Sequence, residues 1–374
     1  MRQDTLGKLI NILRMYDIPL IITVLFIVFW GVINMYSATI HEYKYLYIKQ
    51  FIYAIIGISL AFLIANIDYR KLIYYSFHLY VIGIIALLIV LFAGTTILGA
   101  KRWISIGPIT IQPSELMKFV TILVSARILG QAHEGARLID AVKVLALVSI
   151  PVFLTLAQPD LGTAIMILLP ALVAIFISGI KRKYIILAII LVIISSPFVW
   201  SNLKEYQKNR ILAFLQPEKD PFNTAYHLIQ SQIAIGSGKI FGKGYLQGTQ
   251  SKLFFLPEQH TDFIFATIGE EWGFVISFLL LFLYLFIGLR IIYWGNKISD
   301  LYGKYICYMA GSLITLQAFI NIAMTVGLAP VVGITLPMIS YGGTSLVTFL
   351  LIIGLVLSVI REHKYQTEFN KPKF

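Results

Sequence analysis

Five charged side chains of this sequence lie beside long apolar runs, where an ionised group costs free energy unless it is paired or faces water. They are Arg102, Glu115, Lys118, Asp160 and Asp262. Asp262 stands where a polar segment enters an apolar run, which is typical of a helix N-cap. A carboxylate held partly desolvated at such a boundary can also act as a general base. The pattern by itself favours the cap.

The other four charges form two motifs. Glu115 and Lys118 are three residues apart, so they share a helix face, either as a local ion pair beside an N-cap Ser114 or as part of a binding site. Lys118 and Arg102 together would attract an anion such as a phosphate. Asp160 lies between two apolar runs and is again either a helix cap or a member of the same cavity.

Other polar residues carry weaker signals. His260 fits a polar loop residue, and Ser340 begins a Ser-Tyr-Gly-Gly stretch that is more typical of a turn than of a ligand cradle. The glycines at 236, 238, 242 and 244 lack the context of a nucleotide fingerprint and indicate loop flexibility. Cys307, the only cysteine, is interpreted as a small core residue. The sequence shows no zinc-type cluster, no Ser-His-Asp spacing and no phosphate-binding loop, so an ATP-driven reaction is not expected.

The elements that position these residues are predicted to be membrane helices, which gives an all-α polytopic fold. Hydrophobic residues make up 58% of 374 positions and charged residues only 13%, with a mean hydropathy of +0.83. A spanning helix needs about 20 apolar residues, and ten runs qualify, at residues 18–38, 48–66, 73–93, 114–131, 142–157, 161–180, 184–200, 263–293, 305–328 and 344–361. The fifth run is short, so a broken or shallow helix is expected there. No segment is polar enough for a soluble domain, which predicts one domain over 1–374.

The distribution of basic residues predicts the orientation. Loops on the side of the N-terminus hold 18 Lys and Arg residues, and the short loops opposite hold five. Both termini are therefore expected in the cytoplasm, and the net charge of +12 is read as membrane orientation and not as nucleic-acid binding. The five charged residues named first, Arg102, Glu115, Lys118, Asp160 and Asp262, are then expected on the outer side of the membrane. The long loop 201–262, between the seventh and eighth spans, is expected on the same side. Apolar residues from Tyr226 to Ile235 predict an amphipathic helix at the membrane interface within that loop.

Several motifs in the same order resemble the SEDS family (shape, elongation, division and sporulation) over nearly the whole chain. They are Gly99-Ala100-Lys101-Arg102-Trp103-Ile104, Gln112-Pro113-Ser114-Glu115, Gln158-Pro159-Asp160-Leu161-Gly162-Thr163, Leu256-Pro257-Glu258, His260-Thr261-Asp262-Phe263-Ile264-Phe265 and Ile339-Ser340-Tyr341-Gly342-Gly343. The segments 225–232, 242–251 and 330–337 look like the elongation-type members, with the division-type members, which share the chemistry, as the alternative.

The resemblance implies a peptidoglycan glycosyltransferase that polymerises lipid II at the outer face of the bacterial cytoplasmic membrane, in a complex with a class B penicillin-binding protein. It implies Asp262 as the catalytic residue and a substrate site that includes Glu115, Lys118 and Asp160. We assign Arg102, Arg210, His260 and Ser340 to the same site. A divalent cation, Mg²⁺ or Mn²⁺, is associated with the activity, although the sequence shows no dedicated site for one.

The chemistry we expect is an inverting transfer. Asp262 would remove the proton of the acceptor hydroxyl, Arg102 and Lys118 would offset charge on the leaving pyrophosphate, and Glu115 and Asp160 would position those cations or hold the metal. Two other classes stay open: a flippase of the lipid-linked precursor and a scaffold for the penicillin-binding protein. A secondary transporter would require an internal repeat, and none is evident.

Overall fold

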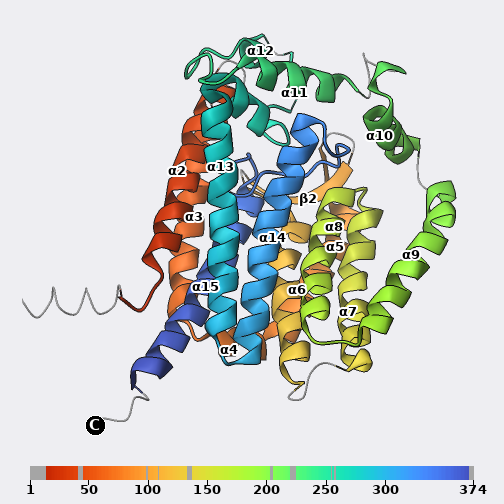
Figure 1. Ribbon diagram of the computed structural model, residues 1–374, viewed down its shortest axis with the longest axis vertical. Helices are drawn as coiled ribbons and strands as arrows, with labels where there is room; N and C mark the ends of the chain where they lie inside the picture. Colours follow the sequence, from red (N-terminus) through yellow and green to blue (C-terminus); the bar gives the residue numbers. More distant parts are fainter. Residues whose placement is uncertain are drawn as a thin grey trace, which may run out of the picture.

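The computed structural model describes residues 14–40, 45–97, 100–107, 109–132, 137–202, 205–219, 225–253, 255–256 and 258–369. Gly99 and Pro257, which belong to two of the motifs quoted above, lie outside the described residues. The chain folds into a helical bundle with a cap of short elements at one end (Figure 1).

Long helices occupy all ten predicted positions. They are α2 (Ile18–Thr39), α3 (Leu46–Asn66), α5 (Ser76–Ala93), α6 (Pro113–Gly130), α7 (Leu138–Ala157), α8 (Leu161–Ile177), α9 (Arg182–Asn202), α13 (Ile264–Lys297), α14 (Leu301–Val326) and α15 (Gly343–Phe369). Seven of these are long and apolar enough to cross a membrane, α8 is apolar but shorter, and α6 carries charged residues. The fifth is not broken as expected: α7 runs for 20 residues through Pro151.

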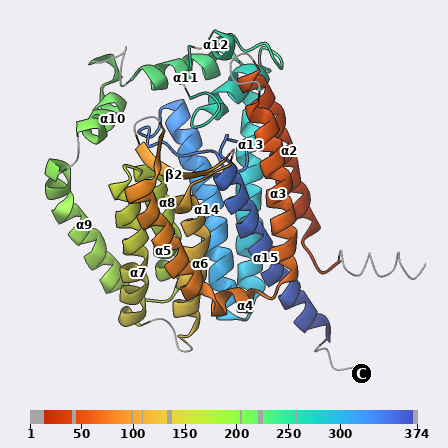
Figure 2. The ribbon, with the colours of Figure 1, turned by 180° about the vertical axis from the view of Figure 1, so that it is seen from behind.

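Helices α6, α14 and α15 form the centre of the bundle. Figures 1 and 2 show α14 and α15 between the α2–α3 pair and the group α5–α8, with α9 at the outer edge of that group. Helix α15 packs against α3 and α6, and α14 packs against α13, α6 and α8. The peripheral helices expose apolar side chains such as Phe62 and Phe92, as lipid-facing helices do.

Short elements cap one end of the bundle (Figure 1). A three-stranded antiparallel sheet, β1 (Thr95–Ile97), β2 (Ala100–Ile106) and β3 (Ile109–Ile111), was not expected in an all-α fold. The long loop folds into α10 (Glu205–Leu215), a 3₁₀ turn (Pro217–Lys219), α11 (Tyr226–Ser237) and α12 (Thr249–Lys252). Helix α11 confirms the helix predicted from the apolar spacing in this loop. The small remaining helix α4 (Tyr69–Tyr74) lies at the opposite end.

The glycine-rich part of the long loop packs tightly, so the expectation of loop flexibility is wrong. Helix α13 is broken at Gly273, whose φ of +74° requires a residue without a side chain. The amides of Phe274 and Val275, left unpaired by the break, donate to the carbonyls of Lys239 and Ile240. A Cβ on Gly242 would lie 2.1 Å from the carbonyl oxygen of Glu271. The loop is thus bound to the break in α13, and the short first half of that helix is held in place.

Both ends of the described chain lie together, at the end opposite the cap. The Lys364 ammonium donates to the carbonyl oxygens of Arg14 and Tyr16 at 2.9 and 2.7 Å. Asp17 caps α2 and pairs with Arg290 of α13 at 2.9 Å. The two ends of the described chain thus lie on one side of the bundle, as an even number of spans requires.

Candidate functional site

Asp262 lies at the entrance to α13 but does not cap it. The residue in the N-cap position is Phe263, and it makes no side-chain cap bond. The Asp262 carboxylate instead points toward the segment between α14 and α15: a methyl group on Gly333 would lie 3.4 Å from its Oδ2. The same methyl group would lie 3.9 Å from Arg210 Nη1. Asp262 and Arg210 therefore face the same stretch of backbone.

The surroundings of Asp262 raise the pKa of its carboxyl group toward neutral pH. Burial raises its pKa from 3.8 to about 6, and the nearby carboxylates of Glu258 and Asp160 raise it too. Arg210 and Arg102 oppose this shift without cancelling it. A carboxyl group whose pKa lies near the working pH is suited to accept a proton. Geometry thus reverses the preference for a cap that the sequence pattern alone supports.

Glu115 and Lys118 form a buried ion pair in the first turns of α6. The Lys118 ammonium donates to Glu115 Oε1 at 2.8 Å, and its side chain is only 1% exposed. It also donates to the amide oxygen of Gln317 at 3.1 Å and lies over the ring of Phe349. The predicted ion pair is confirmed. Ser114, however, is not the N-cap; Gln112 holds that position, without a side-chain cap bond.

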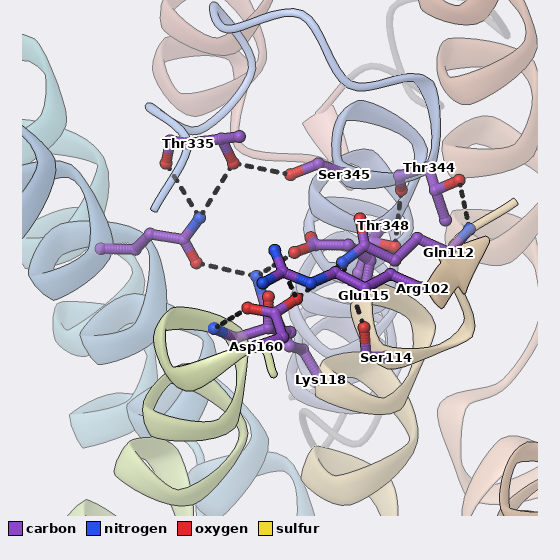
Figure 3. A network of polar contacts seen from close by, with 12 residues as sticks. Arg102, Gln112, Ser114, Glu115, Lys118, Asp160, Thr335, Thr344, Ser345 and Thr348 are labelled. Atoms are coloured by element: carbon purple, nitrogen blue, oxygen red, sulfur yellow. Dashed lines mark hydrogen bonds and ion pairs between the residues drawn. The ribbon is translucent and has the colours of Figure 1, made fainter. Parts of the chain in front are cut away.

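Arg102 and Asp160 join β2 to the start of α8 (Figure 3). Asp160 is the N-cap of α8: its Oδ1 accepts from the Thr163 amide at 3.1 Å, and its Oδ2 accepts from Gln112 Nε2 at 2.9 Å. Arg102 Nη1 lies 3.9 Å from Asp160 Oδ2. The guanidinium also donates to the backbone carbonyls of Gln158 and Pro159. Asp160 is therefore a helix cap, as one interpretation predicted, and it also contacts the charged side chain of Arg102.

The remaining predicted residues border Asp262 in different ways. Ser340 is buried: its hydroxyl donates to the Thr261 carbonyl at 2.6 Å and accepts from the Leu336 amide at 2.8 Å. The carbonyl of His260 accepts from the Tyr341 amide at 2.8 Å. These contacts fix the 260–262 turn against the start of α15. Arg210 is exposed on α10, with its guanidinium over Gly333.

Sequence reasoning missed three amide side chains. Gln112 donates to Asp160, Gln317 accepts from Lys118, and Asn321 donates to the backbone carbonyl of Asp262 at 2.9 Å. Gln317 and Asn321 are four residues apart in α14 and fully buried. Polar side chains repeated at helical spacing in a membrane helix face the protein interior, and this signal was available in the sequence.

A divalent cation finds no dedicated site in the described part of the chain, which has no group of three or more His, Cys, Asp or Glu side chains fit to hold a metal. Both oxygens of Asp160 already accept hydrogen bonds, and the Glu115 carboxylate lies 2.8 Å from an ammonium. Asp160 therefore has both oxygens engaged, whereas Glu115 keeps one buried oxygen, Oε2, without a hydrogen-bond partner among the described residues.

Comparisons with known proteins agree with this architecture. The family model of the FtsW, RodA and SpoVE proteins, described as "Cell cycle protein", matches residues 14–365. The peptidoglycan glycosyltransferase MrdB of Escherichia coli K12 is 39% identical over 82% of this chain and 84% of its own. Stage V sporulation protein E of Bacillus subtilis is 36% identical over 93% and 98%.

Solved structures are similar over the same length. A chain of a peptidoglycan synthase complex, described as coordinating polymerization and crosslinking, has a TM-score of 0.80 and 32% identity over 93% of this chain and 98% of its own. RodA of Thermus thermophilus, a rod shape determining protein, has a TM-score of 0.70 and 29% identity over 93% and 97%.

Proposed function

The chain belongs to the FtsW/RodA/SpoVE family of membrane proteins, and on this premise we propose that it is a peptidoglycan glycosyltransferase that polymerises lipid II during cell elongation. The observation that carries the proposal is Asp262, a partly buried carboxyl group with a pKa near 6 beside two arginines. A group of this kind, next to cations that attract a pyrophosphate, is what a glycosyl transfer from a lipid pyrophosphate requires.

The reaction is a single displacement. Asp262 takes the proton of the acceptor sugar hydroxyl, and the oxygen forms a bond to the anomeric carbon of the donor. The bond from that carbon to the pyrophosphate oxygen breaks, and the lipid pyrophosphate leaves with the electron pair. Attack from the face opposite the leaving group inverts the configuration, so one base suffices and no covalent intermediate forms.

The contacts revise which cations meet the leaving group. Lys118 is buried and already bound to Glu115, Gln317 and an aromatic face, so it supports the site from within. Arg102 is 26% exposed and Arg210 is exposed. These two guanidiniums lie close enough to Asp262 to lower its pKa, and we assign them to the pyrophosphate.

The activity is expected to rise with pH through a midpoint of about 6, because only ionised Asp262 accepts the proton. Replacing Glu258 by Gln removes a negative charge and should move this midpoint to lower pH. Replacing Arg210 by Gln removes a positive charge and should move it to higher pH. Initial rates of polymerisation between pH 4.5 and 8 measure both shifts. Two midpoints that move in the same direction would contradict the assignment.

We propose further that a divalent cation, Mg²⁺ or Mn²⁺, enters with the pyrophosphate of the substrate. Mg²⁺ is commonly bound by one or two carboxylates together with substrate phosphates. EDTA is therefore expected to stop polymerisation while leaving the melting temperature of the substrate-free protein unchanged. A melting temperature that falls on chelation would instead reveal an ion resident in the free protein.

The orientation and the partner follow from the same proposal. The 18 Lys and Arg residues on the terminal side favour a cytoplasmic location for that end, which turns the capped end with Asp262 outward. The structural similarity to a chain of a peptidoglycan synthase complex supports a class B penicillin-binding protein as the partner.

The deciding experiment supplies purified protein with lipid II in detergent, where no membrane remains to be crossed. Glycan strands are expected, with more product when the partner is present. A flippase or a scaffold would yield none, and absence of product with partner and Mg²⁺ present would refute the proposed function.

A further inference from the structure

Two buried amide side chains lie one turn apart on α14. One of them contacts the turn that carries Asp262, and the other contacts the ion pair of Glu115 and Lys118. Gln317 and Asn321 are both fully buried in a helix that is apolar enough to cross a membrane. An amide in such a place costs free energy unless its donors and acceptors are bound. Each residue makes one bond to the site, to Lys118 or to Asp262, and one to the segment that follows α14. The Asn321 Oδ1 atom has no hydrogen-bond partner among the described residues.

Asn321 holds the backbone of the catalytic turn. Its Nδ2 donates to the Asp262 carbonyl at 2.9 Å and to the Ile334 carbonyl at 2.6 Å. One amide nitrogen thus uses both of its hydrogens to join the residue that bears the base to the segment that follows α14. Ser340 secures the neighbouring peptide by donating to the Thr261 carbonyl.

Gln317 makes the corresponding link on the other side. Its Oε1 accepts from the Lys118 ammonium at 3.1 Å, and its Nε2 donates to the Thr335 carbonyl at 3.0 Å. The Thr335 hydroxyl in turn lies 3.2 Å from that of Ser345 at the start of α15 (Figure 3). The buried ion pair is therefore connected to the same segment as the catalytic turn.

The shared partner is the segment 330–336, which is neither helix nor strand and lies between Asp262 and the start of α8. A Cβ on Gly162, in the first turn of α8, would lie 2.8 Å from the carbonyl oxygens of Val332 and Gly333. On its other side Gly333 faces the Asp262 carboxylate. A displacement of this segment would move the base relative to Asp160 and Arg102.

We propose that Asn321 and Gln317 are positioning residues of the glycosyl transfer. They hold the segment 330–336 and thereby keep Asp262 at a fixed position relative to the charged residues on α6 and α8. The inference rests on the proposed function. Both residues act through the groups that they hold in place, and neither contacts the substrate. Amides are required because Gln317 must accept and donate at once, and Asn321 must donate twice.

Isosteric variants test the role of Asn321. Asn321→Asp keeps the shape but turns the donor into an acceptor that faces two carbonyl oxygens, and Asn321→Ala removes it. The matched control is Asn34→Asp, because Asn34 on α2 is equally buried and bonded but contacts Trp30 and Trp272 instead of the site. Both Asn321 variants are expected to lower kcat by about 10²-fold with little change in KM, as displaced catalytic groups do. The control should retain near-normal kcat.

A readout independent of activity follows the Asp262 carboxyl itself. Carbodiimide labels carboxyl groups in the protonated form, and the labelled peptide is quantified by mass spectrometry across pH. The groups that face Asp262 are Glu258, Arg210, Asp160 and Arg102, and loss of the Asn321 bond changes its distance from them. The labelling midpoint of Asp262 should shift in Asn321→Ala and stay unchanged in the control.

The outcomes separate the two proposals. An unchanged kcat and an unchanged labelling midpoint in folded Asn321→Ala would overturn the positioning role. Equal losses of kcat in Asn321→Asp and Asn34→Asp would also overturn it, since buried amides would then matter only for stability. Gln317→Glu, which keeps the acceptor for Lys118 but loses the donor to Thr335, should reduce kcat as well. If the wild-type chain makes no glycan but the labelling midpoint shifts as described, the proposed function fails and the positioning geometry stands.

Discussion

Replacement of Asp262 by Asn is expected to abolish polymerisation of lipid II by the purified protein. The amide has the size of the carboxyl group but cannot accept the proton of the attacking hydroxyl. Loss of a general base lowers a rate by about 10²–10⁴-fold. Measurement of glycan product from lipid II, with the partner and Mg²⁺ present, tests the expectation.

Asp262→Asn should leave the protein folded and at least as stable as the wild type. Because burial and Glu258 raise the Asp262 pKa above 3.8, the folded state holds the ionised form at a disadvantage above about pH 6. The neutral amide removes that disadvantage, which is on the order of 1–3 kcal/mol. Near-normal product from Asp262→Asn would refute the assignment of the base, and an unfolded variant would refute the electrostatic account.

The second large effect is expected at the buried ion pair. Lys118→Met leaves the Glu115 carboxylate buried without its cation, and the Oε2 atom of Glu115 already lacks a hydrogen-bond partner among the described residues. Breaking a buried pair by removing one partner costs about 3–5 kcal/mol. We therefore expect a large fall in melting temperature and loss of activity in Lys118→Met.

The double variant Glu115→Gln with Lys118→Met should recover much of the lost stability, because no uncompensated charge remains. Asp140 and Lys143 on α7 supply the control: they lie 3.9 Å apart, and the Lys143 side chain is 59% exposed. Lys143→Met should cost less than about 1 kcal/mol. Thermal unfolding in detergent compares the variants. Equal destabilisation by Lys118→Met and Lys143→Met would contradict the account of the buried pair.

Local sequence determined the helices of this protein. Each of the ten runs is long enough to satisfy its own backbone hydrogen bonds, and this requirement acts within a segment, so the bounds of nine runs were predictable to a few residues. The last run was predicted to end at residue 361, but α15 continues to Phe369. The pairing of Glu115 with Lys118 followed equally from their spacing on one turn. The three-stranded sheet at 95–111 was missed because its strands are short and irregular, and they are paired only where the chain doubles back beside α5 and α6.

Tertiary structure alone decided what the charges do. In the sequence Asp262 resembles a cap beside Glu258, and only the approach of Gly333 and Arg210 from other segments turns it into a partly buried base. Lys118 resembles a phosphate ligand, and only its burial against α14 and α15 withdraws it from that role. A pKa and a hydrogen bond depend on which groups lie within a few ångströms, and for these residues the neighbours come from far along the chain. The sequence by itself therefore determined where the chemistry-bearing residues gather, and the packing of α14 with the segment 330–336 decided which of them stand ready to react.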